Sequence, residues 1–216
     1  MKNVYFISGL GADKRVFSLL DLSFCNPVFI DWIPPLSHES LTNYALRLRG
    51  KITEPYPTIV GISFGGMLVT EMAKDDKAVK AIIVSSAKTS GEIPFYYKVG
   101  KYVPAYKWIP MSLYHWLMKR FYWILGGKNK EEKELLNNIL SATDINFTKW
   151  AIHSILHWKN KEVSSNIIHI HGTSDKLLPL RFVKASHLIK GGTHVMTLDN
   201  QEEVSDLLKH LLKSDN

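Results

Sequence analysis

The stretch TIVGISFGG, residues 58–66, places a single serine in a glycine-rich turn. Thr58–Ile62 is apolar and β-branched, which predicts a buried strand, and residues 64–74 predict a helix. In a G-x-S-x-G turn of this kind the serine adopts an unfavourable backbone conformation that points its hydroxyl away from the sheet. Side chains at the two glycine positions would clash, because the strand and helix backbones come close together. The pattern indicates that Ser63 is a nucleophile.

Five further short apolar runs predict strands that alternate with helical segments: 4–8, 28–32, 79–85, 167–171 and His187–Ile189. Apolar residues on both faces are typical of strands in a parallel sheet that is covered on both sides. We expect helices at 39–49, with Ser37 as the N-cap, and at the amphipathic segment Gln201–Lys213. The alternation predicts an α/β protein with a mostly parallel, doubly wound sheet of about six strands.

Residues 91–163 interrupt this alternation. They hold five of the six tryptophans, and eleven Lys and Arg against six Asp and Glu. We expect three helices there, at 112–125, 130–140 and 144–158. An aromatic-rich insertion in an α/β frame usually forms a cap over a site, and a packed helical subdomain without a ligand is the alternative. The predicted organisation is a core of residues 1–90 and 164–216 with a helical cap of residues 91–163.

A serine hydroxyl is a poor nucleophile until a base takes its proton, so the hypothesis requires a histidine and an acid that orients it. Asp175 follows the predicted strand 167–171 in a turn. His194 lies in a glycine loop just before the final helix. The order Ser63, Asp175, His194 is the one expected when all three meet at the carboxyl edge of such a sheet.

Acyl transfer also needs hydrogen-bond donors for the negative oxygen that develops on the substrate. The first strand ends in a glycine-rich turn, Ser8-Gly9-Leu10-Gly11, where a backbone N–H can approach the site. We expect the N–H of Leu10 to be one donor and the N–H of Phe64, next to the serine, to be the second.

These motifs resemble those of the α/β-hydrolase superfamily, and the likeness covers nearly the whole chain in order. The resemblance implies that Ser63 is the nucleophile, His194 the general base and acid, and Asp175 its orienting partner, with Leu10 and Phe64 as backbone donors. It also implies a cap inserted after the strand that follows the helix at residues 64–74. Two features depart from many members: Ser-Gly replaces His-Gly at the oxyanion turn, and the leading antiparallel strands are missing.

The function that the resemblance implies is a serine hydrolase acting on a small or medium, largely apolar carboxylic ester or thioester through an acyl-enzyme. A lyase or carbon–carbon bond-cleaving enzyme that uses the same triad is an alternative, and a non-catalytic ligand-binding protein on this fold is another. Glu92, which follows an earlier strand, is an alternative acid, although Asp175 fits its turn better.

Other patterns point to weaker hypotheses. The first strand followed by G-x-G, with Asp31 after the next strand, is similar to a dinucleotide-binding unit, but Lys14 stands where a small residue is needed. His169 and His171 have an i, i+2 spacing that metals can use, without a cysteine or carboxylate companion. His153 and His157, one helical turn apart, fit either a cap pocket or a packing role. We expect no metal and no cofactor.

The composition limits the classes of binding partner that we expect for this chain. The chain of 216 residues has a net charge of +7, but its lysines are scattered, which does not predict nucleic-acid binding. The single cysteine, Cys25, forms no intramolecular disulfide, and no signal peptide or membrane-spanning stretch is recognisable. We therefore expect a cytoplasmic protein, monomeric or homodimeric, with a small-molecule acyl substrate.

Overall fold

The computed structural model describes residues 1–110, 112–113, 116–117, 120, 124–142 and 144–213. Within them, six strands form one sheet in the order β2-β1-β3-β4-β5-β6, and every neighbouring pair is parallel. The prediction of a mostly parallel sheet of about six strands is confirmed. The strands are β1 Asn3–Ile7, β2 Asn26–Ile30, β3 Thr58–Ile62, β4 Lys80–Val84, β5 Ile167–Gly172 and β6 His187–Ile189.

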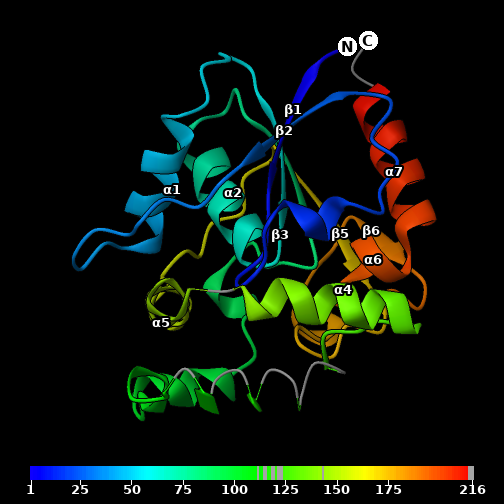
Figure 1. Cartoon of the computed structure of the whole chain (residues 1–216). Coiled ribbons are helices and arrows are strands. Elements are labelled where there is room, and N and C mark those ends of the chain that lie inside the picture. The colour runs from blue at the N-terminus through cyan, green and yellow to red at the C-terminus, as the bar shows by residue number, and fades with distance from the viewer. Residues whose placement is uncertain (111, 114–115, 118–119, 121–123, 143, 214–216) are drawn as a thin grey trace.

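Helices cover both faces of the sheet (Figure 1). On one face α1 (Leu41–Arg49) and α2 (Phe64–Asp75) bury their apolar residues in one hydrophobic cluster. On the other face α6 (Met196–Asp199) and α7 (Gln201–Lys213) contribute to a second cluster. Because both faces are covered, the strands are apolar on both sides, as a parallel sheet requires.

The predicted N-cap of α1 was wrong. Helix α1 begins at Leu41, and its N-cap is Ser40, whose side chain accepts a hydrogen bond from the Asn43 N–H at 3.1 Å. The physical reason lies two residues earlier, where His38 adopts a left-handed backbone with φ 55°. A helix capped by Ser37 would include residue 38, and a right-handed helix cannot contain that conformation. Ser37, although of the right residue type, is therefore too far from the helix to cap it.

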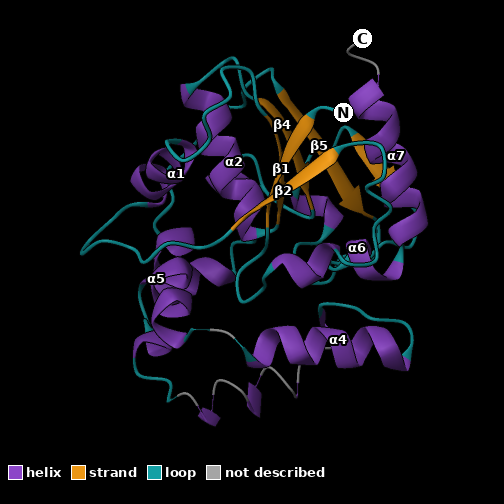
Figure 2. Cartoon of the chain, turned by 45° about the horizontal axis from the view of Figure 1, so that its top comes forward, coloured by secondary structure: helices purple, strands orange, loops and turns teal. Residues whose placement is uncertain are grey.

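The long segment between β4 and β5 contains α4 (Lys130–Ser141) and α5 (Ile145–Leu156). Both lie beyond the carboxyl ends of the strands (Figure 2). They match the predicted helices at 130–140 and 144–158, whereas the helix predicted at 112–125 lies partly outside the described residues. Short 3-10 turns complete the chain: Lys14–Phe17, Ser90–Glu92, Tyr97–Lys101, Ala105–Lys107 and Leu180–Phe182.

No helix in the described part of the chain is both long and apolar enough to cross a lipid bilayer.

The contact between β3 and α2 gives a first test. A Cβ atom on Gly61 would lie 2.6 Å from the carbonyl oxygen of Gly65 and 2.7 Å from Cγ2 of Val69. Gly61→Ala should therefore lower the free energy of unfolding by about 1–3 kcal/mol or more, because the helix must move away from the strand. Urea denaturation followed by circular dichroism measures this change.

Gly50→Ala is the matched control. Gly50 has φ −60°, and a Cβ there would come no closer than 3.5 Å to another atom, the Arg47 carbonyl oxygen. In a compatible conformation Gly→Ala stabilises by about 0.4–1 kcal/mol. Equal stability of the two variants would contradict the close approach of strand and helix at Gly61.

Candidate active site

Ser63 lies between the end of β3 and the start of α2, with φ 50° and ψ −117°. This strained conformation, unusual for a residue with a side chain, costs of the order of 1–3 kcal/mol and must be held by its surroundings. The Ser63 N–H donates to the Val84 carbonyl oxygen at 2.9 Å, and the Ser86 hydroxyl donates to the Ser63 carbonyl oxygen at 2.6 Å. Ser63 remains partly exposed between buried neighbours.

The glycines around Ser63 are required by space. A Cβ on Gly65 would collide with the carbonyl oxygens of Ser8 and Ile7, and one on Gly66 would lie 2.5 Å from the Ser86 Oγ. Helix α2 therefore begins in direct contact with the backbone of β1 and with the loop after β4. The expected crowding at the G-x-S-x-G turn is thus present in the structure.

Ser63, His194 and Asp175 lie within hydrogen-bond distance of one another in series. The His194 Nε2 lies 2.9 Å from the Ser63 Oγ, and its Nδ1 lies 2.8 Å from the Asp175 Oδ2. With the imidazole proton on Nδ1 donated to Asp175, Nε2 accepts the Ser63 hydroxyl proton. The other Asp175 oxygen, Oδ1, accepts the Leu178 N–H at 2.8 Å. The three residues come from the loops after β3, β5 and β6.

The Asp175 carboxyl group is buried, and burial acts to raise its pKa. The positive charge of protonated His194, its hydrogen bond and the Leu178 N–H outweigh burial and hold the pKa of Asp175 below its ordinary value. Asp175 therefore remains an anion at neutral pH, and an anion is what stabilises a positively charged imidazole beside it.

His171 supports the turn that carries Asp175. Its Nε2–H donates to the Leu178 carbonyl oxygen at 2.8 Å, and the same nitrogen lies 3.6 Å from the Asp175 Oδ2. Burial lowers the pKa of His171, so the ring is neutral. The turn that presents Asp175 is thus held at Leu178 by both backbone groups. The sequence places His171 next to the acid turn, but its residue type gives no sign of this hydrogen bond.

His169 packs edge-on against His171 with ring centroids 5.2 Å apart. Burial, together with the neighbouring charges, lowers the pKa of His169 to about 3, so this ring is neutral as well. Neither ring nitrogen of His169 has a hydrogen-bond partner among the described residues. Within the same residues, no group of three or more His, Cys, Asp or Glu side chains is arranged to hold a metal ion.

The turn after β1 approaches the serine closely. A Cβ on Gly9 would lie 3.3 Å from the Ser63 Cβ and 3.9 Å from its Oγ. The Ala12 N–H closes the turn on the Gly9 carbonyl oxygen, and the Ala12 carbonyl accepts both the Ser8 hydroxyl at 2.8 Å and the Trp32 indole N–H at 2.9 Å. Ser8 and Trp32 thus support the turn after β1, in which Ser-Gly stands where many α/β-hydrolases have His-Gly.

The two predicted backbone donors come from the turn after β1 and from the first residue of α2. Leu10 lies within the turn after β1, and Phe64 is the first residue of α2. The first N–H groups of a helix have no acceptor within the helix, and they carry the positive end of its dipole. Phe64 is next to Ser63 in the chain, and Leu10 follows Gly9, which approaches Ser63 closely. The role of both N–H groups as donors to an oxyanion stays a prediction.

Glu92, the alternative acid, is buried and used elsewhere. Its two oxygens accept the Lys88 N–H at 2.6 Å and the Lys184 N–H at 3.1 Å. The carboxylate thus joins the start of the insertion to the loop before β6. It is Asp175 and not Glu92 that contacts His194.

Aromatic rings from the core and from α5 meet beside the serine. The Phe64 ring lies 5.9 Å from Trp32 and 5.9 Å from Trp150, measured between centroids, and 6.3 Å from Phe147. A hollow of about 510 Å³ adjoins this cluster, and its lining includes Gly11, Ala12, Trp32, Ile139, Ala142 and Phe147. An apolar hollow therefore begins at the oxyanion turn, although Ser63 is not among its lining residues.

His153 and His157 line a second hollow, of about 650 Å³, between α5 and the residues at the start of α1. Their rings stack with centroids 4.0 Å apart, and the Tyr106 hydroxyl lies 2.8 Å from the His153 Nδ1. The pair therefore lines a hollow and also packs ring against ring, so the geometry agrees with both interpretations. This hollow is separated from the serine by Trp150, whose ring packs on Phe64.

The whole chain superposes on solved enzyme structures. A thermophilic esterase from Thermogutta terrifontis has a TM-score of 0.78 at 12% sequence identity, with 99% of this chain and 90% of that chain covered. A hydrolase from Pseudomonas aeruginosa gives 0.76 at 12%, covering 98% and 89%. An enol-lactonase from Burkholderia xenovorans gives 0.72 at 10%, covering 98% and 91%. No protein-family model matches the chain, and the search of curated proteins finds no match.

The depressed pKa of Asp175 predicts how stability depends on pH. A group whose pKa is lowered by folding stabilises the folded state above its unfolded pKa, near 3.8, and this contribution is lost as the pH falls through the folded value. Asp175→Asn should therefore be less stable than the wild type at pH 7, and the difference should shrink below pH 3.8. Urea titrations at a series of pH values measure it. A gap that stays constant into the acid range would contradict the assignment.

Proposed function

The chain has the α/β-hydrolase fold, and we propose that it is a serine hydrolase that cleaves a small or medium, largely apolar carboxylic ester or thioester. The observation that carries the proposal is the continuous series of hydrogen bonds from Asp175 through His194 to the Ser63 hydroxyl. Solved structures of the same fold that are titled esterase and enol-lactonase support the same class of reaction. Fold alone does not fix the substrate.

In the proposed reaction Ser63 Oγ attacks the substrate carbonyl carbon while His194 Nε2 takes the hydroxyl proton. Asp175, an anion beside Nδ1, stabilises the imidazolium that forms. The N–H groups of Leu10 and Phe64 donate to the oxyanion. The intermediate then collapses, the carbon–oxygen or carbon–sulfur bond to the leaving group breaks, and His194 gives its proton to the departing alcohol or thiol. Water, deprotonated by His194, attacks the acyl-enzyme and releases the acid and free Ser63.

We assign residues 91–163 to a cap that covers this site. The support is the position of α4 and α5 beyond the carboxyl ends of the strands (Figure 2) and the contact of Phe147 and Trp150 with Phe64. The hollow of about 510 Å³ beside the oxyanion turn then receives the apolar group of the ester. Most of its lining side chains are apolar, with Asp13, Asp144 and Asn146 as the polar ones, and this balance suits a hydrocarbon better than a sugar or a nucleotide.

The remaining expectations complete the proposal. The catalytic groups are all provided by the chain, so the reaction as written needs no cofactor. A cytoplasmic location is expected from cysteine usage, since Cys25 is a free, buried thiol. The enzyme is expected to act as a monomer or homodimer.

A fluorophosphonate probe tests the nucleophile. It should label the wild-type protein covalently on Ser63, and Ser63→Ala should lose both labelling and p-nitrophenyl ester hydrolysis, the latter by at least about 10⁴-fold. Ser174→Ala, which changes an exposed serine in the acid turn, is the matched control and should keep both. Wild-type protein that resists labelling while it binds an ester ligand without turnover would favour a binding protein. Turnover without a trappable acyl-enzyme would favour a lyase.

The apolar hollow predicts a chain-length preference that one substitution can change. Ala142 lines the hollow at the C-terminal end of α4 and is exposed. Ala142→Trp should fill part of the space and lower kcat/KM for p-nitrophenyl octanoate by about tenfold, since about two buried CH₂ groups lose their contacts at about 0.8 kcal/mol each. The value for the acetate ester should stay unchanged. An equal loss for both esters would contradict the proposal that this hollow binds the acyl chain.

A further inference from the structure

The segment from residue 93 to residue 130 has an unusual composition. It carries seven Lys and Arg and no Asp or Glu, although the chain has 20 acidic residues, and it holds eleven of the 24 Phe, Trp and Tyr residues. Cations combined with aromatic residues and without acidic ones are typical of segments that lie at the surface of an anionic lipid bilayer. Composition alone does not decide this, because the aromatic residues could be buried.

The described part of the segment exposes its large apolar side chains. Tyr102 is 82% exposed, Trp108 73% and Trp116 59%, and Val99 and Val103 are exposed beside them. Single exposed apolar side chains are normal on a soluble protein, but a concentration of them within one short segment marks an interaction site. These five exposed residues, together with Lys98 and Lys101 of the turn Tyr97–Lys101, are called the cap face below.

The cap face lies at one extreme of the molecule. Figure 1 shows residues 97–110 as an outer layer beyond α4 and α5, on the side away from both termini. The carboxyl edge of the sheet, where Ser63 lies, faces the same direction. A flat surface can therefore contact the cap face without meeting the sheet or its covering helices.

We propose that the cap face binds the surface of an anionic lipid bilayer. Trp and Tyr rings prefer the headgroup region, where the ring is in contact with hydrocarbon and the N–H or O–H stays hydrated. Each lysine near an anionic headgroup layer adds about fivefold in affinity. The proposal concerns the outer surface of the protein and does not depend on the chemistry at Ser63.

Other occupants fit the cap face less well. In a symmetric dimer each patch meets its own copy, so the cations of one segment would lie against those of the other without an acidic partner in the segment. Nucleic acid would satisfy Lys98 and Lys101, but phosphates make no favourable contact with exposed Val99 and Val103. A lipid surface offers both a negative charge and hydrocarbon.

Vesicle sedimentation with the full chain tests the proposal. The wild-type protein should sediment with phosphatidylcholine vesicles that contain phosphatidylglycerol, and much less with phosphatidylcholine alone, and high salt should release it. Lys98→Glu/Lys101→Glu should weaken binding at least about tenfold through charge. Tyr102→Ala/Trp108→Ala should weaken it at least about tenfold through lost apolar contact, and the remaining binding should keep its salt dependence.

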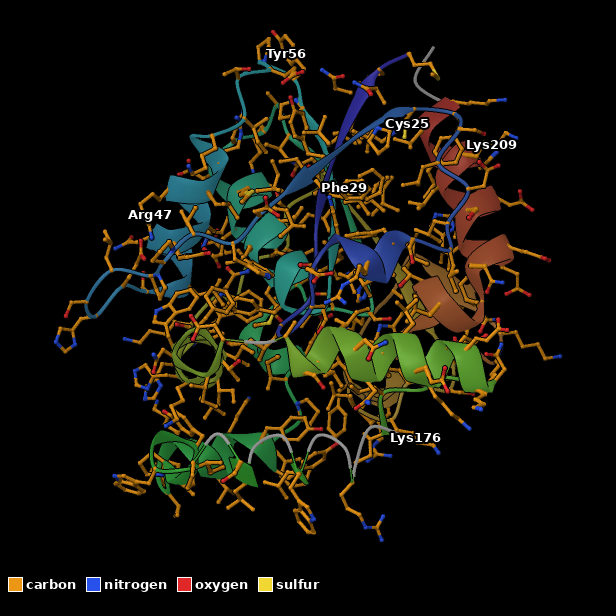
Figure 3. The ribbon with its side chains drawn as sticks, viewed as in Figure 1. Cys25, Phe29, Arg47, Tyr56, Lys176 and Lys209 are labelled. Carbon is orange, nitrogen blue, oxygen red and sulfur yellow. The ribbon has the colours of Figure 1, made fainter. Side chains whose placement is uncertain are left out.

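Tyr56→Ala/Lys209→Glu is the matched control, since it makes the same kinds of change far from the cap face (Figure 3). Tyr56 is 74% exposed, and the control should bind as the wild type does. All variants alter surface residues, and circular dichroism melts verify that they fold. Absence of vesicle binding, equal binding to both vesicles, or an equal loss in the control would overturn the proposal.

Two further outcomes separate this proposal from its alternatives. Light scattering that shows a dimer broken by Tyr102→Ala/Trp108→Ala would assign the cap face to a second copy and overturn the lipid proposal. Ser63→Ala should retain vesicle binding in full. Because the vesicle experiment needs no turnover, its failure would leave the hydrolase proposal standing, and absence of fluorophosphonate labelling would leave the lipid proposal standing.

Discussion

The strained backbone at Ser63 is the constraint on which the rest of the structure depends. A left-handed φ at a residue with a side chain persists only where strand, helix and neighbouring loop leave no alternative. Here the Val84 carbonyl and the Ser86 hydroxyl hold the two peptide groups of Ser63, and α2 starts against the backbone of β1. The glycines of the turn, the parallel neighbours β1 and β4 and the direction of α2 all follow from this one junction.

Asp175 and His194, the proposed acid and base, are held in a similar way, by backbone contacts between adjacent loops. The Thr173 N–H donates to the Ile189 carbonyl oxygen and the Ser174 N–H to the Gly192 carbonyl oxygen. A Cβ on Gly172 would collide with the Gly192 backbone. The loops after β5 and β6 are therefore held together by their backbones. The contact of His194 with Asp175 follows from this pairing of the loops.

The strands, the main helices and the Ser63, Asp175 and His194 series were predictable because each depends on local pattern or on a motif with its own geometry. The residues that support the site could not be predicted in this way. Ser8, Trp32, Ser86 and His171 act through hydrogen bonds to backbone carbonyls, several of them far away in the chain, and a carbonyl acceptor leaves no trace in residue type. Ser37 failed as a cap for a related reason, since the backbone of His38 decided where α1 could begin.

The pairing of β4 with β5 joins residues 81–84 to residues 167–170 across the whole insertion. Ser63 lies before that gap, whereas Asp175 and His194 lie after it. During synthesis on the ribosome, Ser63 and the first four strands emerge before Asp175 and His194, so under the proposed mechanism the nascent chain would carry the serine without its base and acid. Non-local pairing of this kind is slow to form. The proposed hydrogen-bonded series of Ser63, His194 and Asp175 thus forms only after strands on both sides of the insertion have paired.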